Sequence, residues 1–274
     1  MIRNNKPLLF LILGFIGGAI GSFLSEFLPE MSEQSYATVL VHTSIWMSLI
    51  GGMISLALFV ASEIYHRRRG FLTGQAFKYI LAGVIGGLIA GAVAQAVYNG
   101  NFVSLMVKHF ILRPICWGIM GAILGWRLAS TIPNLTRKRA AIAGGIGGIA
   151  GGAVFLLVGN YMPEAIGRLV GVGALGAALG LAMVVVDSMF REATLEIVWA
   201  PREVTTVALG AIPVTIGGGD DHVFVAGLAQ ASARIVIEHG KIQYVDTATQ
   251  RRTELRDGSK LKIGRIEVIV HATR

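Results

Sequence analysis

The first 190 residues alternate between long apolar runs and short polar segments. Six apolar runs lie near residues 8–28, 41–63, 79–98, 111–130, 140–160 and 166–188. A membrane-spanning helix needs about 20 mostly apolar residues, so each run predicts one span. The first run follows a basic N-terminus, as in a signal peptide. It is longer than the apolar core of about 7 to 15 residues that a signal peptide carries, so we interpret it as a retained span.

Beyond about residue 194 the pattern changes to short segments in which apolar and polar residues alternate. Eight candidate strands cover residues 194–200, 204–209, 214–216, 223–225, 233–238, 241–246, 260–263 and 266–271. Turn signals separate them, among them Gly217-Gly218-Gly219-Asp220 and His239-Gly240. Many short strands with tight turns predict an all-β sandwich.

Composition supports two domains, residues 1–190 in the membrane and residues 191–274 outside it. The chain is 54% hydrophobic and 15% charged, which is too apolar for an ordinary soluble domain. Its net charge of +8 resides largely at the ends of the apolar runs, which indicates membrane topology rather than nucleic-acid binding. Lys and Arg mark cytoplasmic loops. Both termini are therefore predicted to be cytoplasmic. The N-terminus and the loops on its side of the membrane contain the basic residues Arg3, Lys6, Arg67, Arg68, Arg69, Lys78, Arg137, Lys138, Arg139 and Arg191. The opposite loops contain the acidic residues Glu26, Glu30, Glu33 and Glu164, with Lys108, Arg113 and Arg168 as basic exceptions.

The spans carry two recurring small-residue patterns. The odd-numbered spans share G-x-x-G-G with a small residue four positions on, which places Gly14, Gly18 and Ser22 on one face, and likewise Gly83, Gly87, Gly91 and Gly144, Gly148, Gly152. The even-numbered spans share a second pattern, in which three small residues follow a reference residue at identical offsets. In the fourth span Arg113 precedes Gly118, Gly121 and Gly125, and in the sixth span Arg168 precedes Gly173, Gly176 and Gly180. In the second span Thr43 stands at the arginine's place, before Ser48, Gly51 and Ser55. Small faces let membrane helices pack closely. The pattern predicts three Gly-rich helical hairpin repeats, about 8–63, 79–130 and 140–188.

Candidate enzyme chemistry is sparse. Residues 171–176, GVGALG, match a dinucleotide-binding fingerprint, but they lie inside the sixth span and follow no strand, so we interpret them as helix packing. The six histidines have no ligand spacing and Cys116 is the single cysteine, so we expect no metal, no cofactor and no catalytic site. Glu63, Arg127 and Asp187 lie at span ends, which disfavours an ion-coupled carrier. Residues 99–113 predict a short interfacial helix.

Residues 205–272 resemble the forkhead-associated (FHA) domain. The resemblance rests on VTIGGGDDHVFVAGLAQASARIVIEHGKIQYVD and, most specifically, on LRDGSKLKIG at residues 255–264. The whole chain resembles bacterial membrane proteins with Gly-rich spans and a C-terminal FHA domain, and REATL at residues 191–195 fits their junction. The resemblance implies a β-sandwich whose loops read phosphothreonine peptides.

The phosphate-reading positions that the resemblance implies are replaced in this chain. The family's arginine falls on Gly218, its serine on Ala229 and its histidine on Ser232, and its later S-x-N-G stretch is replaced near residues 248–252. Gly218 and Ala229 offer no side-chain donor for a phosphate. Arg234, Arg251, Arg252 and Arg256 are either a different anionic contact or solvated surface charges.

Two function hypotheses follow. The first is a non-enzymatic scaffold in a bacterial inner membrane, whose degenerate cytoplasmic FHA-like domain docks a protein partner, phosphorylated or not, or joins a larger membrane complex or homo-oligomer. The alternative is a passive channel or transport-complex subunit that this domain regulates. Membrane lipid is expected as a partner and nucleic acid is not. An enzyme has no supporting constellation of residues.

Overall fold

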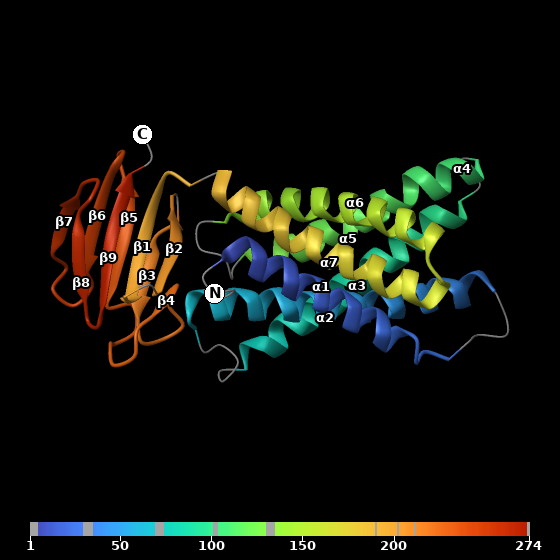
Figure 1. Cartoon of the computed structure of the whole chain (residues 1–274), viewed down its shortest axis with the longest axis horizontal. Coiled ribbons are helices and arrows are strands. Elements are labelled where there is room, and N and C mark those ends of the chain that lie inside the picture. Colours follow the sequence, from blue (N-terminus) through green and yellow to red (C-terminus); the bar gives the residue numbers. More distant parts are fainter. Residues whose placement is uncertain are drawn as a thin grey trace.

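The computed structural model describes residues 5–29, 35–68, 74–100, 104–129, 135–189, 191–201, 203–210 and 212–272. Four residues used in the orientation prediction, Arg3, Glu30, Glu33 and Arg69, lie outside these ranges, as does the side chain of Glu164. Figure 1 shows a long helical bundle with a β domain (residues 193–272) at one end.

In the part of the chain that the structure describes, six helices are long and apolar enough to cross a membrane. The chain is therefore a membrane protein with a β region after the last span. The helices are α1 (Lys6–Ser25), α2 (Tyr36–His66), α3 (Gln75–Asn99), α4 (Leu105–Val107), α5 (Arg113–Leu128), α6 (Arg137–Tyr161) and α7 (Glu164–Met189), with a π-helical turn η3 (Lys108–Leu112) directly before α5. Of residues 99–113, where a short interfacial helix is expected, residues 105–112 are helical and residues 101–103 lie outside the described ranges. From Leu105 the chain continues through η3 into α5.

The six long helices form a closed ring. Each packs on the next along the chain, and α7 returns to pack along α1. Helices α2, α5 and α7 also meet one another, so they surround the centre of the bundle. Large apolar side chains such as Ile85, Ile89, Ile142 and Ile146 on α3 and α6 are exposed, as expected for helix faces that meet lipid.

The β domain has two sheets. Its strands are β1 (Ala193–Ala200), β2 (Glu203–Leu209), β3 (Val214–Gly217), β4 (Val223–Phe224), β5 (Ala233–Glu238), β6 (Lys241–Asp246), β7 (Arg252–Leu255), β8 (Lys260–Ile263) and β9 (Ile266–Ala272). One sheet has the order β2-β1-β9-β8 and the other β4-β3-β5-β6-β7. Alternate residues of both sheets, among them Leu195, Val268, Ile216 and Ile235, fill one shared core.

The predicted hairpin of β5 and β6 is present, and the turn chemistry explains its register. His239 and Gly240 have φ values of 53° and 74°. Two positive φ values in a two-residue loop match the twist of paired strands, which is why X-Gly turns close hairpins. Strand β7, by contrast, was not predicted.

Candidate functional site

The predicted packing glycines lie where neighbouring helices approach each other closely. A Cβ atom on Gly14 would overlap the carbonyl oxygen of Gly176, and the same holds for Gly83 with Gly51 and for Gly144 with Gly121. These contacts join α1 to α7, α3 to α2 and α6 to α5. At each remaining predicted glycine, an added Cβ atom would lie within 2.8 Å of a neighbouring helix: Gly18, Gly87, Gly91, Gly148, Gly152, Gly118, Gly125, Gly173 and Gly180. Because the obstructing atoms are mostly backbone, these helices tolerate little more than hydrogen at the contacts.

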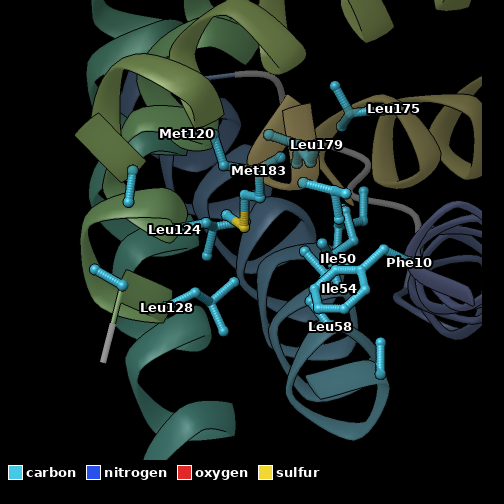
Figure 2. Close-up of a cluster of buried hydrophobic side chains, with 14 of the residues drawn as sticks. Phe10, Ile50, Ile54, Leu58, Met120, Leu124, Leu128, Leu175, Leu179 and Met183 are labelled. Carbon is cyan, nitrogen blue, oxygen red and sulfur yellow. The ribbon is translucent and has the colours of Figure 1, made fainter. Parts of the chain in front are cut away.

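The centre of the bundle holds a column of buried apolar side chains, which we call the central plug. It consists of Ile50, Ile54 and Leu58 on α2, Met120, Leu124 and Leu128 on α5, and Leu175, Leu179 and Met183 on α7. Each is at most 1% exposed. Figure 2 shows these side chains converging between the three helices, with Phe10 of α1 beside them. They stand seven, eleven and fifteen residues after Thr43, Arg113 and Arg168, so the three helices contribute equivalent positions.

Helix α2 anchors the β domain to the bundle. The Tyr65 hydroxyl donates to the carbonyl oxygen of Thr206 at 3.1 Å and accepts from the Thr206 N–H at 3.1 Å, so it pairs with β2 as a neighbouring strand would. Just after the helix, the Arg67 guanidinium forms an ion pair with Glu203 at 2.6 Å and lies 4.7 Å from the centre of the Trp199 ring. These contacts fix β1 and β2 against the end of α2.

The edge of the β domain that faces the bundle consists of β2 and β4, the outermost strands of the two sheets (Figure 1). Arg68, which pairs with the buried Glu63 at 3.3 Å, also acts electrostatically on Asp220 and His222 of the β3–β4 loop. Burial lowers the pKa of Arg68 below its ordinary value, and Glu63 opposes that shift. Covering an edge strand removes a surface on which other chains add strands.

The three replaced phosphate-reading positions converge on one atom. The carbonyl oxygen of Ala229 accepts from the Gly218 N–H at 3.0 Å and from the Ser232 hydroxyl at 2.7 Å. A Cβ atom on Gly218 would overlap the Leu228 carbonyl oxygen. An arginine side chain therefore has no room at this position, and the two loops are closed on each other.

The same two loops are also bridged by an internal carboxylate. Asp221 is 3% exposed, and its Oδ2 accepts from the Gly219 N–H at 3.2 Å and from the Ala231 N–H at 2.9 Å. Backbone N–H groups of adjacent loops are the donors that would otherwise hold an anion. This role of Asp221 was not predicted from the sequence. Its only sequence signal was the acidic pair Asp220-Asp221 in the glycine-rich loop.

The groove beside these loops has one cationic side chain, Lys262, among the described residues that line it. It has a volume of about 400 Å³ and is lined by loop residues together with Tyr244, Asp246 and Lys262. The arginines proposed as anion contacts do not line it. Arg234 and Arg252 lie on the outer face of the second sheet, both opposite Val245, and Arg252 pairs with Glu238 at 2.8 Å while largely exposed. Arg251 and Arg256 are exposed at the ends of β7. This arrangement favours solvated surface charges.

His222 is partly buried in the β domain, and its hydrogen bonding predicts a pH-dependent stability. Its Nδ1 accepts from the Thr215 N–H at 3.1 Å, so protonation of Nδ1 would remove a backbone hydrogen bond. Burial, and secondly the charge of Arg68, lower the pKa of His222 from 6.5 to about 4. Between these pH values the unfolded chain binds a proton that the folded chain does not, so the free energy of unfolding falls as pH falls.

We therefore expect the contribution of His222 to be complete above about pH 6.5 and lost towards pH 4, a change on the order of 3 kcal/mol. Thermal unfolding of the β domain within the full chain, followed by Trp199 fluorescence between pH 7.5 and 4.5, measures it. His222→Asn retains an acceptor near the position of Nδ1 and does not titrate, so it should flatten this part of the profile. An unchanged slope in this variant would contradict the assignment.

Comparison with known proteins gives no further guide to the site: no protein-family model, curated protein or solved structure matches this chain.

Proposed function

We propose that this chain is a non-enzymatic membrane scaffold whose FHA-like β domain docks a protein partner without standard phosphothreonine reading. The observation that carries the proposal is the central plug. Nine side chains that are at most 1% exposed fill the space between α2, α5 and α7, and all nine are apolar. A conducting path needs polar groups or water along its length, and the plug opposes both. The β domain is then the part of the chain that offers polar surface to a partner.

The absence of phosphate reading is inferred from the loop contacts. Gly218 has no room for a side chain, and Asp221 occupies the N–H donors of Gly219 and Ala231. A phosphate brought to these loops would meet a buried carboxylate. Like charges at that separation repel, and the repulsion is strong at a buried site. The two-sheet architecture agrees with the sandwich that the FHA resemblance implies.

We further infer that the bundle consists of three hairpin repeats related by an approximate threefold axis. The support is the equivalence of contacts: Gly14 with Gly176, Gly83 with Gly51 and Gly144 with Gly121 occupy matching positions. Each contact joins an odd-numbered span to an even-numbered span of a neighbouring repeat. The glycine faces therefore act between repeats, as a glycine zipper that closes the ring. From the resemblance to bacterial membrane proteins we infer a bacterial inner membrane, and from the distribution of Lys and Arg we infer that both termini are cytoplasmic.

The test of the scaffold combines flux with binding. In proteoliposomes that contain the full chain, we expect potassium and proton flux equal to that of protein-free vesicles. In detergent, phosphothreonine peptides should bind no better than their unphosphorylated counterparts. A partner that co-purifies in mild detergent should remain bound after phosphatase treatment.

Two outcomes would contradict the proposal. Flux well above the protein-free level, abolished by a bulkier substitution in the plug such as Ile54→Phe, would favour the channel alternative. Micromolar peptide binding that disappears on dephosphorylation would restore phosphothreonine reading.

A further inference from the structure

A second candidate site lies at the end of the bundle opposite the β domain. There a cavity of about 330 Å³, which we call the distal cavity, opens between α2, α3, α5, α6 and α7. Cavities that hold small ligands begin at about this size. Met47 and Trp117 are both buried and line it. Met47 and Trp117 precede Ile50 and Met120, the first plug residues of α2 and α5, by three residues. The distal cavity therefore lies next to the plug, on the side away from the β domain, and the plug closes its inner end.

Equivalent positions of the three central helices line the distal cavity. They are Thr43 on α2, Arg113 on α5 and Arg168 on α7, the residues from which the glycine offsets are counted. Gln95 of α3 accepts from the Thr43 hydroxyl at 3.0 Å, and Glu26 of α1 pairs with Arg168 at 2.9 Å. The position on α6 that corresponds to Gln95 and Glu26 is Leu156. Leu156 offers Arg113 neither a charge nor a hydrogen bond.

The π-helical turn brings a further cation to the same place. In η3 the Arg113 N–H donates to the carbonyl oxygen of Lys108, five residues earlier, so both side chains emerge on one face. The Lys108 ammonium lies 5.9 Å and the Arg113 guanidinium 6.0 Å from the centre of the Tyr98 ring. Among the described side chains, Lys108, Arg113 and Arg168 are opposed here by Glu26. These described side chains comprise three cations and one carboxylate.

The inner wall of the distal cavity is aromatic. The rings of Trp46 and Trp117 are 5.8 Å apart, and those of Trp117 and Phe155 are 5.6 Å apart. Cationic groups at the rim and an aromatic wall below suit a ligand with an anionic head and an apolar body. The cations stand at the ends of two spans, which is the depth at which lipid phosphates lie.

We propose that the distal cavity binds a phosphate-bearing ligand, with the phosphate between Arg113 and Arg168 and an apolar portion against Trp46 and Trp117. Two arginines pair well with phosphate because the guanidinium offers parallel donors. The same phosphate chemistry occurs in the headgroup of an anionic phospholipid and in a soluble organic phosphate. This site would also account for Lys108, Arg113 and Arg168, the three basic residues that depart from the charge distribution of the other loops.

Native mass spectrometry of the full chain in detergent tests this proposal. The probes are phosphatidylglycerol, the zwitterionic phosphatidylcholine and soluble glycerol 3-phosphate. Arg113→Gln combined with Arg168→Gln should weaken phosphatidylglycerol binding at least about tenfold. Arg113→Lys combined with Arg168→Lys keeps both charges and should retain part of the binding that the glutamine variant loses. Arg137→Gln is the matched control. Arg137 is also a span-end arginine on an aromatic ring, 5.3 Å from the centre of Trp126, but it does not line the distal cavity.

Occupancy of the distal cavity is measured separately by tryptophan quenching. Phosphatidylglycerol brominated in its acyl chains should quench the parent chain more than a Trp46→Phe/Trp117→Phe variant, and the arginine variant should lose this difference. If glycerol 3-phosphate binds in the same arginine-dependent manner and competes with the lipid, the phosphate group is the recognised element and a soluble organic phosphate is the ligand source. If glycerol 3-phosphate does not bind, the phospholipid is the ligand source. Equal binding of phosphatidylcholine, or unchanged phosphatidylglycerol binding in the double glutamine variant, would overturn the proposal.

Discussion

Replacing Asp187 by alanine should destabilise the bundle by about 3 kcal/mol. Asp187 of α7 pairs with Lys6 of α1 at 2.7 Å, and the two side chains are 7% and 10% exposed. Removing one partner of a buried pair leaves an uncompensated charge, and Lys6 would be left in that position beside the Tyr65 ring. A neighbouring cavity of about 360 Å³ admits some screening, which places the effect at the low end of the range for buried pairs. Thermal unfolding in detergent, followed by tryptophan fluorescence, measures the loss.

Two variants make this result specific. The double substitution Lys6→Met with Asp187→Leu removes both charges and should recover most of the stability, since no charge is left unpaired. Glu254→Ala breaks a pair of equal chemistry, Lys241 with Glu254 at 3.0 Å, but both side chains are about half exposed. That change should stay below about 1 kcal/mol. A loss for Asp187→Ala no larger than for Glu254→Ala would mean that this buried pair contributes no more to stability than an exposed one.

Gly144→Ala should destabilise the bundle by about 2 kcal/mol, whereas Gly145→Ala should change its stability by less than about 0.5 kcal/mol. The added Cβ on Gly144 would overlap the Gly121 carbonyl oxygen and lie 2.8 Å from the carbonyl carbon. These are backbone atoms of α5, so α5 and α6 would have to separate. At Gly145 the nearest atoms are 3.7 Å from the Cβ, which is ordinary contact.

The comparison isolates packing because both substitutions are Gly to Ala, in adjacent positions of one helix. Helix propensity favours alanine equally in both. Gly159→Ala, where nothing lies within 4 Å of the Cβ, is a second control in the same helix. Unfolding midpoints in detergent give the differences. Equal midpoints for Gly144→Ala and Gly145→Ala would show that the close approach of α5 and α6 does not contribute to stability.

Much of the fold can be predicted because its signals are local. Apolar length alone predicts the six helices, and strict alternation predicts strands such as β5 and β6 almost to the residue. Strand β7 escapes this reasoning because three of its four residues are exposed, which leaves no alternation to detect. The turn η3 escapes it too, since a π-helical turn has no hydrophobic period of its own.

The candidate sites divide in the same way. Matching offsets single out the glycine faces and the series Thr43, Arg113 and Arg168 from sequence alone, and alignment with the FHA pattern singles out Gly218, Ala229 and Ser232. Neither predicts that Asp221 fills the loop donors or that Lys6 meets Asp187, 181 residues away. Hydropathy and offset describe each segment by itself, so the sequence determined six spans, their small-residue faces and most strands. Only the tertiary structure decided which faces meet, because that choice depends on the packing of all the helices at once. The same packing decided where the central plug, the covered edge of the β domain and the distal cavity lie.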